Sequence, residues 1–126
     1  MSNILIISSD ITRANNLSTI LTFLGESCAS VLFSCAIEKL RGENDIKAIL
    51  IDAATPELAC DISEKFPRQP FILVGNHVTF EPQTNIVGAI SEPMTYPALT
   101  QMLHRCQQYK RSHPNTKTSV HNKTRL

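Results

Sequence analysis

The sequence predicts a single α/β domain in which helices cover both faces of a parallel sheet. Its 126 residues fit one domain of ordinary size. Hydrophobic residues make up 42% and charged residues 18% of the chain, which suits a packed core and not a disordered protein. Short apolar runs also alternate with segments of helical periodicity. This alternation is typical of parallel strands joined by right-handed helical crossovers.

Five apolar runs of strand length predict the strands, as expected where both faces of a sheet are buried. The expected strands are residues 3–8, 28–33, 47–52, 71–75 and 86–90. Apolar spacing predicts helices over residues 11–24, 34–42 and 56–66 and a last helix that begins at Pro97. Asp10 is the expected N-cap of the first helix, and Gly25 ends it. The segment 76–85 contains Pro82, so the fourth helix of the order βαβαβαβ(α)βα is expected to be short or degenerate.

This element order matches the flavodoxin-like doubly wound fold, with strand order 2-1-3-4-5. In that topology a ligand lies at the carboxyl ends of the strands, near the switch point between strands one and three. The side chains expected at this edge are Ser8, Ser9, Asp10, Asp52, Gly75 and Glu92. The loop after the first strand lacks the glycines of a phosphate-binding loop, which argues against a nucleotide-binding enzyme.

The charges divide the chain into an acidic body and a basic tail. Residues 1–109 hold all 11 acids and seven Lys or Arg residues, whereas residues 110–126 hold five bases and no acid. We interpret 1–109 as the folded domain and 110–126 as a flexible linker. A salt-sensitive attraction of the tail to nucleic acid is an alternative, although no recognition helix or zinc site accompanies it.

The remaining composition predicts a cytoplasmic protein with reduced thiols. No apolar run approaches the roughly 20 residues that a membrane span needs, so no membrane association is expected. The four cysteines contain no Cys-x-x-Cys pair, and neither a zinc ribbon nor a redox dithiol is indicated.

Ile49-Leu50-Ile51-Asp52 followed by Pro56 resembles the receiver domains of two-component response regulators. The resemblance places Asp52 at the position of the phosphoacceptor. It also implies that the peptide bond between Glu92 and Pro93 is cis. Without phosphorylation, Asp52 would be a strand-end residue that caps the following loop.

The other parts of the receiver site are missing from the sequence. Ser8 and Ser9 stand where receivers carry an acidic pair for Mg²⁺, which leaves Asp10 as the nearby acid. Gly75 replaces the switch hydroxyl, and Glu92 replaces the lysine that neutralises the phosphoryl group. A carboxylate there would repel that group, so we expect no catalytic residue, no metal site and no phosphorylation of Asp52.

A resemblance over nearly the whole chain points to the N-terminal domain of FleQ/FlrA flagellar master regulators. It is carried by 15–26, which ends in Phe-Leu-Gly-Glu, and by Leu103-His104-Arg105 with Tyr109 in the last helix. The resemblance implies a sigma-54-dependent activator in which the tail leads to a AAA+ ATPase and a DNA-binding domain. Cyclic di-GMP and ATP would then bind the full-length protein, and no cofactor is expected in this domain.

The favoured hypothesis is a non-catalytic regulatory module of a flagellar gene activator, which acts through contacts with its own AAA+ domain and within a homo-oligomer such as a dimer. Sigma-54 RNA polymerase and DNA would be reached through the other domains. The alternative is a phosphorylatable receiver that uses Asp52. On the last helix, Leu99, Met102, Leu103 and Cys106 are expected to face the sheet. A partner would then meet the opposite face, which carries Gln101, Arg105 and Gln108.

Overall fold

The computed structural model of the chain describes residues 3–42, 45–54, 56–76 and 85–112. Five strands form one sheet: β1 (Asn3–Ile7), β2 (Cys28–Val31), β3 (Ile46–Asp52), β4 (Phe71–Gly75) and β5 (Ile86–Ser91). Four helices accompany them: α1 (Ile11–Phe23), α2 (Phe33–Gly42), α3 (Pro56–Lys65) and α4 (Tyr96–Ser112). All strand pairs are parallel, and the spatial order is β2-β1-β3-β4-β5. The predicted doubly wound fold is therefore confirmed.

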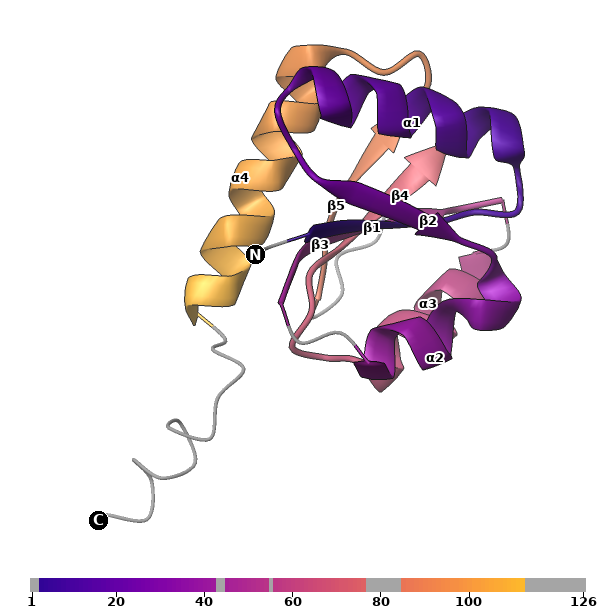
Figure 1. Cartoon of the computed structure of the whole chain (residues 1–126). Coiled ribbons are helices and arrows are strands. Elements are labelled where there is room, and N and C mark those ends of the chain that lie inside the picture. Colours follow the sequence, from indigo (N-terminus) through magenta and orange to yellow (C-terminus); the bar gives the residue numbers. More distant parts are fainter. Residues whose placement is uncertain (1–2, 43–44, 55, 77–84, 113–126) are drawn as a thin grey trace.

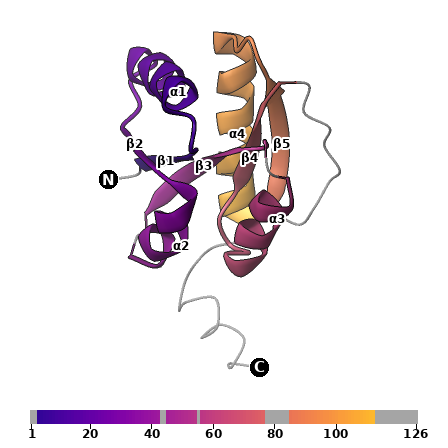
Figure 2. The same ribbon diagram turned by 90° about the vertical axis from the view of Figure 1, so that its right-hand side faces the viewer.

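The sheet separates two apolar cores. Helices α1 and α4 cover one face, and α2 and α3 cover the other (Figure 1). Figure 2 shows α1 and α2 on opposite sides of β1 and β2. Successive residues of a strand point to opposite faces, so Ile4 and Ile6 of β1 enter the first core while Leu5 and Ile7 enter the second. Both faces of the central strands are thus buried, as their continuous apolar sequence predicts.

Several predicted boundaries differ from the observed ones by a few residues. Strand β2 ends at Val31, two residues before the expected end, because α2 already begins at Phe33. Helix α4 begins at Tyr96 and continues to Ser112, so the expected boundary after residue 109 lies inside this helix. The predicted short helix within 76–85 falls almost entirely on residues 77–84, which lie outside the described residues, as does the rest of the tail.

The first helix has the predicted capping at both ends. The Asp10 carboxylate accepts a hydrogen bond from the backbone N–H of Arg13 at 3.1 Å, which satisfies one of the free N–H groups at the helix start. Gly25 follows the helix with φ of +86°, a conformation that glycine adopts without steric cost. Because α1 begins directly after β1, its first turn lies at the carboxyl edge of the sheet.

Helix α4 packs closely on β5 through Gly88. A Cβ atom added to Gly88 would lie 2.4 Å from Sδ of Met102, so a larger residue would force the Met102 side chain to move. The face prediction for α4 agrees with the burial: Leu99, Met102, Leu103 and Cys106 are buried, whereas Gln101, Arg105 and Gln108 are exposed. Burial also raises the pKa of the Cys106 thiol to about 12, against an opposing effect of Lys110, and keeps this thiol protonated at neutral pH.

Side-chain donors close the amino edge of the sheet. The Asn85 amide nitrogen donates to the backbone carbonyls of Ser63, Phe66 and Gln69 at 2.8–3.1 Å. These carbonyls belong to the end of α3 and the loop after it, where the regular helix bonds stop. At the end of α4, the Tyr109 hydroxyl donates to the Pro67 carbonyl at 2.6 Å.

Among the described helices, none is long and apolar enough to cross a membrane.

Candidate functional site

The carboxyl edge of the sheet contains an ion-pair network centred on Arg13. The Arg13 Nη1 atom lies 2.8 and 2.9 Å from the two carboxylate oxygens of Asp52. Its Nε and Nη2 atoms lie 3.1 and 3.0 Å from the two carboxylate oxygens of Glu92. One guanidinium therefore joins α1 to the end of β3 and to the connection that follows β5. The planar arrangement of the guanidinium N–H donors allows it to bind two carboxylates at once.

Asp52 has no free carboxylate oxygen in this arrangement. Its Oδ2 atom also accepts a hydrogen bond from the Ser8 hydroxyl at 2.9 Å, and its Oδ1 atom accepts one from the backbone N–H of Ala54 at 2.9 Å. The bond from Ala54 confirms the interpretation of Asp52 as a cap of the following loop. The Asp52 side chain is only 5% exposed, so its charge is stabilised almost entirely by protein groups.

The environment of Arg13 favours its charged form. The pKa of Arg13 is raised above its ordinary value, first by the hydrogen bonds to Glu92 and then by those to Asp52 and by the two negative charges. Partial burial opposes this shift without cancelling it. The Arg13 side chain is 12% exposed and the Glu92 side chain 25%. The cation is therefore a permanent part of the site.

The structure brings together three of the six predicted site residues as side chains: Ser8, Asp52 and Glu92. Asp10 is adjacent but serves as the cap of α1, and its own N–H donates to Ser8 Oγ at 3.0 Å. Gly75 contributes its backbone carbonyl, which accepts from the Glu92 N–H at 2.9 Å. Ser9 is exposed. The peptide bond between Glu92 and Pro93 is cis, as predicted.

Arg13 is the member of the site that the sequence analysis missed. Glu92 was expected to leave a repulsive negative charge in the pocket, and instead it forms an ion pair with Arg13. A signal for this was present in the sequence. A base in the first turn of a helix is opposed by the positive end of the helix dipole, so Arg13 needed acidic partners from elsewhere. The strand ends that supply Asp52 and Glu92 lie at the same edge of the sheet.

The network resembles a charge-compensated site more than a reactive one. A buried aspartate that acts as a nucleophile needs an accessible lone pair, and all the Asp52 oxygens accept hydrogen bonds here. In the described part of the chain, no group of three or more His, Cys, Asp or Glu side chains is arranged to hold a metal ion. At this edge of the sheet, the Arg13 guanidinium supplies the positive charge that a bound metal ion could otherwise supply.

Comparisons with solved structures show that the fold is that of receiver domains. A response regulator receiver domain from Clostridium thermocellum matches with a TM-score of 0.73 at 15% identity, over 88% of this chain and 98% of that one. A CheY-like receiver domain from Methanospirillum hungatei matches with a TM-score of 0.72 at 18% identity, over 89% and 98%. NtrX from Brucella abortus matches with a TM-score of 0.73 at 15% identity, over 97% of this chain and 29% of the longer one.

The sequence itself matches one protein family. A search of curated proteins found no match. The family described as "Flagellar regulatory protein FleQ" matches residues 3–108, which include every strand and most of α4. This match confirms the resemblance derived from the sequence, and the receiver fold of the chain agrees with it. The chain belongs to the FleQ family of flagellar regulatory proteins.

Proposed function

We propose that this domain is a non-catalytic regulatory module of a sigma-54-dependent flagellar transcriptional activator, acting in the cytoplasm. It modulates oligomerisation and assembly of the ATPase through contacts with its own AAA+ domain and with other copies of the chain. Sigma-54 RNA polymerase and DNA are reached through the other domains of the protein. Cyclic di-GMP and ATP likewise belong to those domains, and this domain holds no cofactor.

The observation that carries the proposal is the saturation of Asp52 by Arg13, Ser8 and Ala54. Transfer of a phosphoryl group to Asp52 would require the guanidinium to leave, and the buried carboxylate would lose its main counter-charge. The incoming group would then lie near Glu92, which carries the same sign of charge. The site therefore favours a permanent ion pair over a cycle of phosphorylation, and a domain without chemistry acts through contacts.

Incubation with acetyl phosphate and Mg²⁺, followed by intact-mass measurement, tests the proposal. We expect no mass gain, while a receiver domain with a complete acidic site gains one phosphoryl group under the same conditions. The Asp52→Asn variant is the matched control. A mass gain in the unmodified chain that disappears in Asp52→Asn would establish the alternative function, a phosphorylatable receiver, and would refute the proposal.

A further inference from the structure

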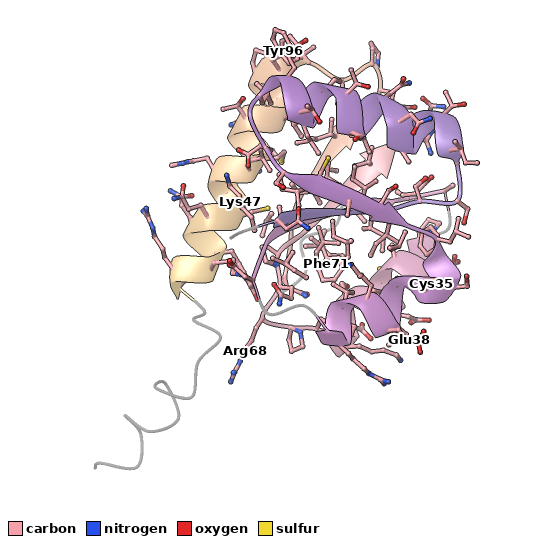
Figure 3. The ribbon with its side chains drawn as sticks, in the orientation of Figure 1. Cys35, Glu38, Lys47, Arg68, Phe71 and Tyr96 are labelled. Atoms are coloured by element: carbon pink, nitrogen blue, oxygen red, sulfur yellow. The ribbon has the colours of Figure 1, made fainter. Side chains whose placement is uncertain are left out.

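The connection between β5 and α4 is tied to α1 at two places. At one end, Glu92 binds the guanidinium of Arg13 in the first turn of α1. At the other end, the ring of Tyr96, the first residue of α4, stacks on the ring of Phe23, the last residue of α1, with centroids 5.3 Å apart and planes inclined by 17°. Figure 3 shows Tyr96 where α4 begins beside α1. Residues 92–96 therefore run along the length of α1.

An open pocket lies between α1 and the connection. It has a volume of about 560 Å³ and borders the ion pair through Glu92. Its lining consists of Asn16, Thr19, Ile20, Asn76, Glu92, Pro93 and Met94. Open space on this scale provides no dense packing between the connection and α1. Met94 is half-buried and packs against the core that α1 and α4 share, so the connection is held by this contact and by the contacts at its two ends.

One of these ties is weaker than the other. Phe23 is 74% exposed and Tyr96 is 46% exposed, so their stack is largely accessible to water and excludes little apolar surface. The Arg13 side chain is only 12% exposed, and its guanidinium makes two hydrogen bonds to Glu92. Charge-assisted paired bonds of this kind fix geometry as well as contributing energy. Of the two ties at the ends of the connection, the one made by Arg13 is therefore the stronger.

The opposite end of α4 is held independently. The Tyr109 hydroxyl donates to Pro67, and the Lys110 ammonium donates to the backbone carbonyl of Ile46 at the start of β3. The close contact of Met102 with Gly88 adds a steric restraint in the middle of the helix. These three contacts lie on the amino-edge side of the first turn of α4 and involve no residue of the Arg13 network.

We propose that Arg13 is a latch: it holds the β5–α4 connection against α1 and so positions the first turn of α4, while the last turns stay anchored at the amino edge. Opening the latch loosens the start of α4 without unfolding the sheet, while the fully buried Leu99 keeps the helix on the sheet. The latch rests on the proposed function, because it gives a domain without phosphorylation a means to change the position of α4. It uses a change of ion pairing in place of a covalent modification.

The two tyrosines of the chain provide a reporter at each end of α4. The sequence contains no others, and Tyr96 lies at the latched end while Tyr109 lies at the anchored end. Ring signals of ¹³C-labelled tyrosine, recorded by NMR on the full chain and assigned with Tyr109→Phe, therefore follow both ends in one spectrum. Stacking on Phe23 shifts the Tyr96 ring protons away from their positions in an unstructured chain.

Glu92→Ala is the test variant, and Glu57→Ala is its matched control. Both remove one carboxylate from the carboxyl edge, but Glu57 is an exposed residue in the first turn of α3. Glu92→Ala leaves the Arg13–Asp52 pair in place, so the buried aspartate keeps its counter-charge. A third variant, Arg13→Lys, keeps the positive charge but lacks the planar donors that bridge two carboxylates.

We expect Glu92→Ala and Arg13→Lys to move the Tyr96 signals toward unstructured positions and to leave the Tyr109 signals unchanged. Amide exchange at residues 98–101 should rise by at least about tenfold, with no change at residues 106–109. Glu57→Ala should alter neither tyrosine. Unchanged Tyr96 signals in Glu92→Ala would overturn the latch, as would equal changes at Tyr96 and Tyr109. Neither result depends on phosphoryl uptake, so the latch and the proposed function fail separately.

Discussion

The two edges of the sheet are held together by different chemistry. At the carboxyl edge, charged side chains bind one another: Arg13 joins Asp52 and Glu92. At the amino edge, side-chain donors bind backbone carbonyls: Asn85 closes the loop after α3, and Tyr109 holds the end of α4. An ion pair between Lys47 and Glu26 also lies at the amino edge. Because it is partly exposed, it contributes little to the stability of the fold.

The contacts at the carboxyl edge can change when the ion pairing of Arg13 changes, whereas the carbonyl contacts at the amino edge do not depend on charge. A backbone carbonyl carries no net charge and does not change its protonation state, so the carbonyl contacts at the amino edge do not depend on ion pairing. A buried ion pair costs desolvation energy and is often no more stabilising than an apolar replacement. Its presence at the edge where receiver domains carry their chemistry therefore indicates a role in specifying position. The following substitutions test this contrast, in order of decreasing effect.

Replacement of Arg13 by Ala should produce the largest loss of stability. It leaves the Asp52 carboxylate buried without its counter-charge, which we expect to lower the free energy of unfolding by about 3 kcal/mol. Urea denaturation followed by circular dichroism measures the change. The double variant Arg13→Ala/Asp52→Asn removes the unpaired charge as well and should recover most of the loss. A double variant no more stable than the single one would show that charge compensation is not the cause.

Replacement of Asn85 by Ala should have the second largest effect. Asn85 is 3% exposed and its amide contacts three carbonyls. Its removal takes this donor away from all three, although the Ser63 and Phe66 carbonyls keep a backbone N–H donor. We expect a loss of about 2 kcal/mol in the same denaturation experiment. Asn76→Ala, at an exposed position, is the matched control and should stay within about 0.5 kcal/mol of the unmodified chain. Equal effects of the two substitutions would contradict the role assigned to Asn85.

Replacement of Tyr109 by Phe tests one contact of the amino edge alone. It removes the hydroxyl that donates to Pro67 and keeps the buried ring. Because Pro67 is exposed, water can satisfy its carbonyl after the substitution. We therefore expect a loss of only about 1 kcal/mol and no change of the Tyr96 ring signals. A shift of those signals would show that the two ends of α4 are coupled and would weaken the contrast between the edges.

The sequence was a better guide to the fold than to the site, for a physical reason. Strand and helix patterns are local, so the continuous apolar run of β3 and the helical spacing of α4 were sufficient to predict both elements. Asp52 and Glu92 were placed at the carboxyl edge because topology puts every strand end there. The pairing with Arg13 depends on how far one side chain reaches across neighbouring elements, which no periodicity encodes. The charge of Glu92 was therefore interpreted without its partner.

The smallest expected effect on stability concerns the outer face of α4. Gln101, Arg105 and Gln108 are exposed there, opposite the buried face, and their role as an interaction face remains a prediction. Surface substitutions without special contacts usually change stability little, so Arg105→Glu should stay within about 0.5 kcal/mol of the unmodified chain.

If this face pairs copies of the chain, Arg105→Glu should nevertheless weaken concentration-dependent self-association measured by sedimentation, because it reverses a charge within the interface. Gln107→Glu, an exposed change on the same helix but outside the predicted face, is the control and should leave association intact. A monomer at high concentration for the unmodified chain would remove the face as a contact between copies. The outer face of α4 would then be free for the AAA+ domain, which is the other partner that the proposed function requires.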